Sequence, residues 1–159
     1  MAMHTWFECK IRYEKVMENG MQKKVTEPYL VDALSFTEAE ARIIEEMTPF
    51  ISGEFTVSDI KRANYSELFP SDEESADRWF KCKLIFITLD EKSGAEKKTS
   101  TQVLVQAADL RDAVKKLDEG MKGTMADYQI GIVSETPLMD VYPYSAEPND
   151  KPEFDPSKA

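Results

Sequence analysis

Apolar and polar residues alternate along the first segment of the chain. Its apolar side carries Phe7, Cys9, Ile11 and Tyr13, and its other side carries Trp6, Glu8, Lys10, Arg12 and Glu14. A period of two is typical of a half-buried β-strand. A second segment of this kind places Phe80, Cys82, Leu84 and Phe86 on its apolar side. The two segments begin almost identically, with WFECK at 6–10 and WFKCK at 79–83, which indicates an internal repeat.

The similarity continues in three collinear blocks. WFECKI aligns with WFKCKL, residues 30–47 with 104–121, and residues 55–70 with 128–143, at offsets of 73 or 74. Apolar residues coincide in the last block, as at Val57/Ile130 and Ile60/Val133, and both copies end in proline. We therefore predict a tandem duplication, with a first repeat at 1–70 and a second at 78–143.

Each repeat is predicted to fold as β-β-α-β. Asn19-Gly20 and Ser93-Gly94 favour tight turns, after which return strands follow at 29–33 and 103–107. Ser35 and Glu38 form a capping box, and Asp109 and Asp112 hold the matching positions. Helical spacing then indicates core-facing stripes at Phe36, Ala39, Ile43 and Met47 and at Leu110, Ala113, Leu117 and Met121. Third strands are expected at about 53–63 and 127–134.

A right-handed crossover makes the second and third strands parallel and leaves room for the first strand between them, antiparallel to both. Pro28 places the second strand of the first copy at a sheet edge. One such unit leaves much apolar surface uncovered. We therefore predict an α+β fold in which the two repeats pack as one pseudo-two-fold domain with a shared core and an antiparallel or mixed sheet. Residues 71–77, SDEESAD, are predicted to form an acidic linker, and residues 144–159 a disordered tail.

Composition changes this picture little. The 159 residues are 42% hydrophobic, which is enough for a packed core. The net charge is −10, but the predicted linker has four acidic and no basic side chains and the predicted tail four acidic and two basic, so the folded part is closer to neutral. The sequence has no run of eighteen apolar residues, no pattern of a signal peptide and only two cysteines. We therefore expect a soluble cytoplasmic protein that does not contact a membrane.

The sequence offers no catalytic constellation. His4 is the only histidine, no phosphate-binding glycine loop is present, and the carboxylates of the two predicted helices fall on their polar faces. We expect no enzyme activity, no cofactor and no metal site, although a carboxylate-metal phosphoesterase stays an alternative because oxygen ligands need no fixed motif. Cys9 and Cys82 are interpreted as buried packing residues. A redox pair is the alternative if the two first strands meet.

The candidate binding residues lie on the other side of the two first strands. They are Trp6, Lys10 and Arg12 in the first repeat and Trp79, Lys81 and Lys83 in the second. Interleaved aromatic and basic side chains suit a protein interface, or stacking and phosphate contacts with single-stranded nucleic acid. A third possibility is that this side is covered by the other repeat, because Ile85, Ile87 and Leu89 make it apolar in the second copy.

The strings TWFECKIRYEK, KKVTEPYLVDALSFTEAEARI, FTVSDIKRANYSE and RWFKCKL also carry a resemblance to a known family. They are similar to uncharacterised proteins of Bacteroidales-type gut bacteria and their phages and mobile elements, grouped as a domain of unknown function. The resemblance extends to about Tyr144 and implies a cytoplasmic protein of phage or mobile-element origin, with a role near DNA metabolism or host interaction. It implies no catalytic or binding residue.

These observations favour a small non-enzymatic binding or accessory protein that acts through a protein–protein contact, with a homodimer as one possible form. A single-stranded nucleic-acid binder that uses Trp6, Trp79 and the strand lysines is the alternative, and a carboxylate-metal phosphoesterase is a third.

Overall fold

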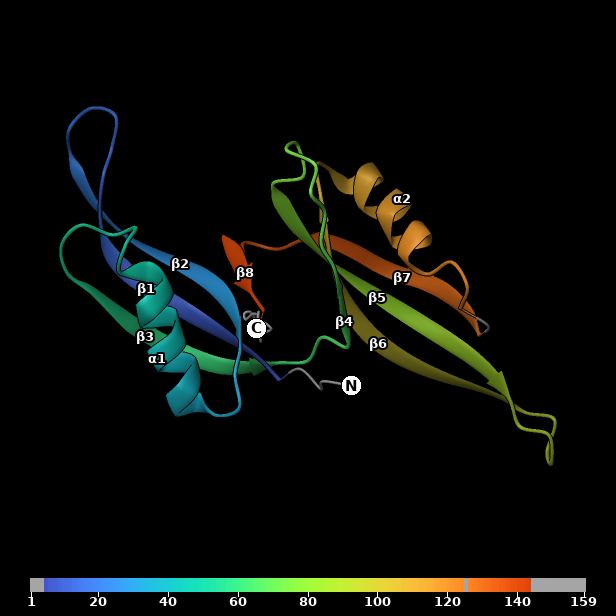
Figure 1. Ribbon diagram of the computed structural model, residues 1–159. Helices are drawn as coiled ribbons and strands as arrows, with labels where there is room; N and C mark the ends of the chain where they lie inside the picture. Colours follow the sequence, from blue (N-terminus) through green and yellow to red (C-terminus); the bar gives the residue numbers. More distant parts are fainter. Residues whose placement is uncertain (1–4, 125, 144–159) are drawn as a thin grey trace, which may run out of the picture. The chain divides into compact units, whose positions relative to one another are not determined.

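The protein has a mixed α+β fold, as the sequence predicts. A computed structural model describes residues 5–124 and 126–143 (Figure 1). His4 and the predicted tail at 144–159 lie outside these residues. In order, the described elements are β1 (Trp6–Val16), β2 (Gln22–Asp32), α1 (Phe36–Met47), β3 (Phe55–Ala63), β4 (Glu67–Phe69), β5 (Arg78–Leu89), β6 (Glu96–Ala107), α2 (Leu110–Gly120), β7 (Asp127–Glu135) and β8 (Asp140–Tyr142).

The chain divides into two compact units, each with a four-stranded mixed sheet. Of the described residues, unit 1 comprises 5–63 and 138–143, and unit 2 comprises 64–124 and 126–137. Unit 1 has the strand order β3-β1-β2-β8, and unit 2 has the order β4-β6-β5-β7. The first strand of each unit lies between the second and third and is antiparallel to both, which confirms the predicted arrangement. Each unit has its own hydrophobic cluster. The predicted packing of the two repeats as one domain with a shared core stays a prediction.

The two shortest strands complete these sheets from distant parts of the chain. Strand β4 follows β3 in sequence but pairs in parallel with β6 of unit 2, and β8 follows β7 but pairs in parallel with β2 of unit 1. The compact units therefore differ from the sequence segments 1–70 and 78–143, because the last short strand of each segment joins the sheet of the other unit. Because β8 covers Tyr29–Val31, β2 is not an edge strand there, contrary to the expectation from Pro28.

Local sequence signals account for the turns and helix starts. Gly20 and Gly94 have φ angles of 84° and 72°, which glycine adopts without a steric cost. The N–H of Glu38 donates to Ser35 Oγ at 3.1 Å, and the N–H of Asp112 donates to Asp109 Oδ1 at 2.8 Å. Both predicted caps are thereby confirmed, and α1 ends at Met47, just before Pro49.

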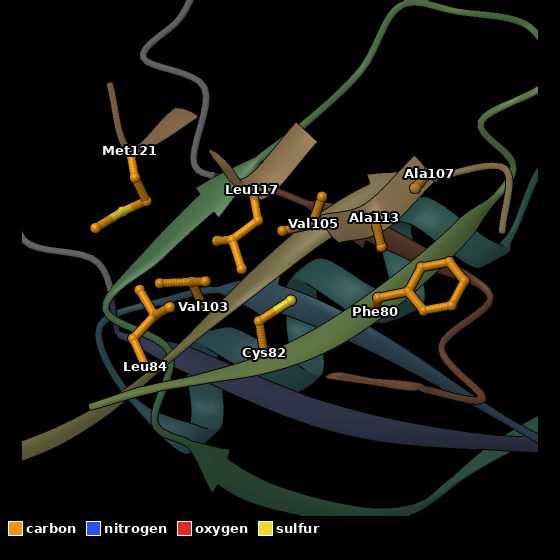
Figure 2. Close-up of a cluster of buried hydrophobic side chains, with 9 residues drawn as sticks. All are labelled: Phe80, Cys82, Leu84, Val103, Val105, Ala107, Ala113, Leu117 and Met121. Carbon is orange, nitrogen blue, oxygen red and sulfur yellow. The ribbon is translucent and has the colours of Figure 1, made fainter. Parts of the chain in front are cut away.

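A helix covers one face of each sheet and forms the core with it. Figure 2 shows the cluster of unit 2, in which Cys82 of β5 lies among side chains of β6 and α2. The cluster of unit 1 has matching positions, among them Phe7, Cys9, Ile11, Ala39, Ile43 and Met47. The helix stripes begin one turn later than predicted, because Phe36 and Leu110 are 50% and 51% exposed. Both are the first residues of their helices, although the Phe36 ring still contacts Phe7 edge-on at 4.9 Å between centroids.

A β-bulge interrupts the outer ladder of each unit at the same place. Lys10 pairs with Asp59 and Ile11 with Val57, which leaves Ser58 as the extra residue. In unit 2, Lys83 pairs with Ile132 and Leu84 with Ile130, which leaves Gly131 as the extra residue. The bulges align the two sheets residue by residue, since an inserted residue fixes the register on both sides of it.

Candidate functional site

The six candidate binding residues all lie on the side of each sheet that faces away from its helix, which we call the outer face. Trp6 and Trp79 are buried, with exposed fractions of 3% and 5%. Of the basic residues, Arg12 is exposed, and the others are half-buried: Lys10, Lys81 and Lys83. As folded, neither indole is open to a base or a partner, and whether these residues bind anything stays a prediction.

The tryptophans belong to a buried apolar end of each outer face. In unit 1, Leu30 and Val141 share this end with Trp6, at 0% and 8% exposure. In unit 2, Leu104 is also fully buried and lies on the same face as Trp79. At this end the two units are alike.

The opposite ends of the two outer faces differ in chemistry. The aligned bulges match Arg12 with Ile85, Glu14 with Ile87 and Asp59 with Ile132. Unit 1 thus presents charged groups where unit 2 presents isoleucine. We call the set in unit 2 the aliphatic face, and it consists of Ile85, Ile87, Leu89 and Ile132.

The aliphatic face is open to solvent in part. Leu89 is 67% exposed and Ile132 is 55% exposed, and Ile85 and Ile87 are half-buried. Contiguous exposed apolar side chains of this kind mark interaction surfaces more often than lone ones do. The sequence reasoning missed Ile132, because simple alternation places it with Ile130 in the core, whereas the bulge at Gly131 moves it to the outer face.

A second exposed apolar group lies at the end of the β1–β2 hairpin in unit 1. Val16, Met21 and Phe50 are 65%, 66% and 76% exposed. Val16 and Phe50 line one hollow, which also includes Gln22 and Gly53. We call Val16, Met21 and Phe50 the apolar tip. They are few and lie on a hairpin and a loop, so they are less pre-arranged than the aliphatic face, which lies across two paired strands.

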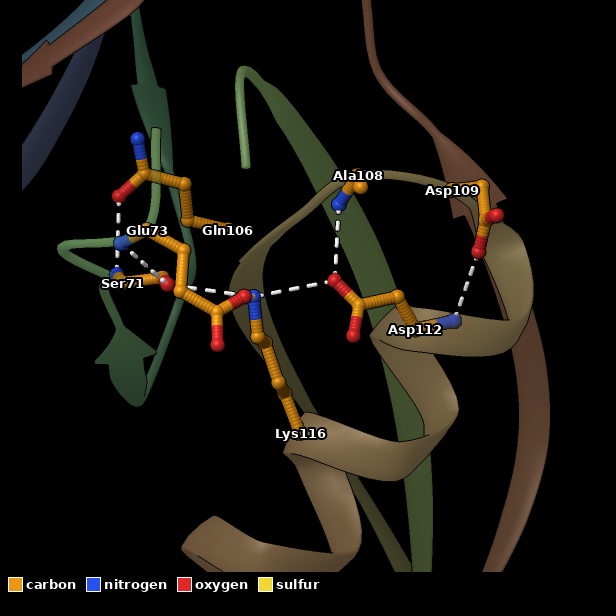
Figure 3. Close-up of polar contacts among 7 residues, drawn as sticks. All are labelled: Ser71, Glu73, Gln106, Ala108, Asp109, Asp112 and Lys116. Atoms are coloured by element: carbon orange, nitrogen blue, oxygen red, sulfur yellow. Dashed lines mark hydrogen bonds and ion pairs between the residues drawn. The ribbon is translucent and has the colours of Figure 1, made fainter. Parts of the chain in front are cut away.

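Polar contacts concentrate around Lys116 of α2 (Figure 3). Its Nζ lies 3.0 Å from Asp112 Oδ2 and donates to Glu73 Oε1 at 2.8 Å and to Ser71 Oγ at 3.1 Å. The N–H of Ser71 donates to Gln106 Oε1 at 3.0 Å. These bonds fasten the start of the acidic segment 71–77 to β6 and α2 within unit 2.

The charges in this cluster favour a structural role. A hydrogen bond from the N–H of Ala108 and the contact with Lys116 hold the pKa of Asp112 below its usual range. Burial alone would lower the pKa of Lys116, but its bonds to Glu73 and Asp112 outweigh this and raise it. Lys116 therefore stays protonated at neutral pH and is not available as a base or nucleophile. The adjoining hollow of about 740 Å³ is shallow and is lined partly by Phe69 and Gly120.

The comparisons with known proteins identify the family. Residues 5–144 match the model of DUF4494, a domain of unknown function. The chain belongs to the DUF4494 family. This confirms the resemblance to a family of unknown function, and the matched range includes every strand and helix from β1 to β8. No curated protein and no solved structure matches the chain.

Within residues 5–124 and 126–143, no three or more His, Cys, Asp and Glu side chains group closely enough to hold a metal ion. Over the same residues, neither helix combines the length and the apolar character needed to span a membrane.

Both cysteines of this DUF4494 protein are free and fully buried, each in the core of its own unit. Burial raises the pKa of Cys9 to about 12, with smaller contributions from Glu8, Asp59 and Glu40. Burial also raises the pKa of Cys82 to about 11. This agrees with the interpretation of both as packing residues.

We predict that neither thiol reacts with Ellman's reagent in the folded protein at about pH 8, because only an accessible thiolate attacks the disulfide of the reagent. Both thiols should react stoichiometrically once urea unfolds the chain. Absorbance of the released thionitrobenzoate measures the rates. Rapid reaction of either thiol in the absence of urea would show that its core is open.

Proposed function

We propose that this protein is a small non-enzymatic binding or accessory protein that acts through a protein–protein contact. The aliphatic face of unit 2 supports this proposal most directly. Its isoleucines stand at positions where the equivalent sheet of unit 1 carries Arg12, Glu14 and Asp59, so the fold itself does not require apolar residues there. Apolar side chains kept on an open face suit a protein partner.

Transfer of the unit 1 residues to unit 2 tests this proposal. The variant Ile85→Arg/Ile87→Glu/Ile132→Asp removes the apolar surface and uses side chains that the same sheet positions accept in unit 1. We expect it to fold, with Cys82 still protected, and to lose the protein partners that the wild-type chain captures from its native host. Quantitative mass spectrometry of affinity captures, with and without nuclease, measures the difference.

A matched control changes the charged positions of unit 1 instead. The variant Arg12→Glu/Glu14→Arg reverses two outer-face charges and leaves the aliphatic face intact. It should capture the same proteins as the wild type. Equal capture by wild type, control and Ile-substituted variant, or capture that nuclease abolishes, would refute the proposed protein contact.

The nucleic-acid alternative gains no support from the geometry, because the two indoles that would stack on bases are buried. Titration with oligo-dT at low salt tests it through quenching of tryptophan fluorescence. The phosphoesterase alternative likewise gains no support from the arrangement of the carboxylates in the described residues.

We further propose that the chain arose by tandem duplication of a ββαβ unit. The equivalent strand orders, the aligned bulges at Ser58 and Gly131 and the matching caps at Ser35 and Asp109 support this origin. A cytoplasmic protein of Bacteroidales, phage or mobile-element origin, as the sequence resemblance implies, belongs to the same proposal.

A further inference from the structure

We propose that the aliphatic face is the contact between two copies of this chain, packed face to face with their β5 strands antiparallel. This inference rests on the proposed protein-binding function and names the partner that the face accepts. The order of charges along β5, the side chains of the face and its size support this contact.

Charges are ordered along the outer face of unit 2. Lys81 and Lys83 lie at the end nearer Trp79, where they pair across the sheet with Leu104 and Gln102. At the far end, Asp127 pairs with Ile87 and Glu96 pairs with Leu89. The face therefore runs from basic through aliphatic to acidic, with Lys98 beside Ile87 as the one basic side chain near its far end.

A two-fold axis makes this order self-complementary. If the axis lies in the contact plane and is perpendicular to β5, the basic end of each copy lies over the acidic end of the other. A parallel arrangement would place Lys83 against Lys83 instead. Because complementary charges select register and orientation, the observed order favours the antiparallel dimer.

The side chains of the face suit packing of one sheet on another. With the axis between Ile85 and Ile87, each Ile85 lies over Ile87 of the partner subunit, and Leu89 and Ile132 fill the flanks. Branched aliphatic side chains on two sheets packed face to face interdigitate at a separation of about 10 Å. A nucleic acid would find no exposed aromatic ring among these four residues.

The size of the face sets the expected affinity. Residues 83–89 extend roughly 20 Å along β5, and three strands extend roughly 10 Å across it. Such a face is smaller than the ~800 Å² that each partner contributes to a standard interface. We therefore expect a weak dimer, with a dissociation constant on the order of 100 µM.

Sedimentation equilibrium of the full chain over a range from about 1 to 300 µM tests the proposal directly, because that range brackets the expected dissociation constant. The wild type should pass from monomer to dimer. The variant Ile85→Arg/Ile87→Glu/Ile132→Asp should stay monomeric throughout, with protection of Cys82 as the check that unit 2 is folded. The control Arg12→Glu/Glu14→Arg should dimerise like the wild type.

Charge reversal then tests the antiparallel register. Lys83→Glu and Glu96→Lys should each raise the dissociation constant about tenfold, because a two-fold dimer contains the contact twice. The double variant should recover wild-type association. Within one copy, Glu96 pairs with Leu89, which lies six residues from Lys83 along β5, so Lys83 and Glu96 are roughly 20 Å apart. Recovery in the double variant can therefore come only from a contact with the partner subunit.

Each other outcome is decisive. A wild type that stays monomeric overturns the dimer, and the protein-binding function survives only if host proteins are still captured through the aliphatic face. A dimer that persists in the Ile-substituted variant places the contact elsewhere. Growth beyond two copies overturns the two-fold contact and indicates head-to-tail association of the aliphatic face with the apolar tip, since a heterologous contact builds rings or open chains. A double variant that fails to recover refutes the antiparallel register.

Discussion

A chain that ends at Pro137 is expected to lose the folded state of unit 1, whereas a chain that ends at Pro143 keeps it. The shorter chain lacks β8, which is the strand that covers Tyr29–Val31 of β2. It also lacks two buried side chains, Leu138 at 7% and Val141 at 8% exposure. Their burial contributes about 1.5–3 kcal/mol each, which is a large part of the few kcal/mol that stabilise a small unit.

Further contacts of the same segment increase the effect. The Tyr142 ring stacks on Tyr29 with 6.2 Å between centroids, and the N–H of Met139 donates to the carbonyl of Pro28 at 2.9 Å. Arg42 of α1 donates to the carbonyl of Pro143 at 3.3 Å. A chain that ends at Pro143 retains all of these contacts and is the matched control.

The two buried thiols report on each unit separately. In a Cys82→Ala background, Cys9 should react with Ellman's reagent in the chain that ends at Pro137 and stay protected in the chain that ends at Pro143. In a Cys9→Ala background, Cys82 should stay protected in both, because unit 2 keeps β4. Protection of Cys9 in the shorter chain would mean that β8 is dispensable.

Local rules made much of each unit predictable from the sequence. Gly20 and Gly94 fix the hairpins because positive φ angles are open to glycine. Ser35 and Asp109 begin the helices because their side chains satisfy free N–H groups. The handedness of the crossover then determines which strand lies in the middle of the sheet.

The destinations of the short strands were not predictable in the same way. Leu68-Phe69-Pro70 and Val141-Tyr142-Pro143 coincide in the repeat alignment, so their equivalence is visible in the sequence. An apolar triplet can add to any uncovered sheet edge, however, and nothing local distinguishes β2 from β6 as its partner. Only the tertiary structure shows that β4 joins unit 2 and β8 joins unit 1.

The sequence predicts on which side of each sheet the candidate residues lie. It does not predict which part of that side is exposed. Alternation places Trp6 and Trp79 on the outer face, but periodicity carries no information about what covers a face. Simple alternation assigns Ile132 to the wrong face because it ignores the bulge. The sequence does carry a signal for that bulge: core residues are spaced by three, at Val57 and Ile60 in one copy and at Ile130 and Val133 in the other. A regular strand with a period of two cannot place both residues in the core. One extra residue, and hence a β-bulge, must lie between them.

The second large effect is expected from Phe80→Ala in the core of unit 2. Phe80 is 1% exposed and lies in one cluster with Val105 and Ala113 (Figure 2). Truncation of a buried phenylalanine lowers the free energy of unfolding by about 3–5 kcal/mol, because the lost contacts leave a cavity. Urea unfolding, followed through Cys82 in a Cys9→Ala background, should show a midpoint lowered by roughly 2 M.

The matched substitution in unit 1 turns this measurement into a test of domain organisation. Phe7 is fully buried at the equivalent position and also lies under the Arg62 guanidinium, 5.8 Å from the ring centroid. Because each unit has its own hydrophobic cluster, we expect Phe80→Ala to lower the midpoint reported by Cys82 more than that reported by Cys9, and Phe7→Ala to do the reverse. Equal shifts of both thiols in both variants would contradict this expectation. They would show that the two units unfold as one cooperative domain, as the predicted pseudo-two-fold packing requires.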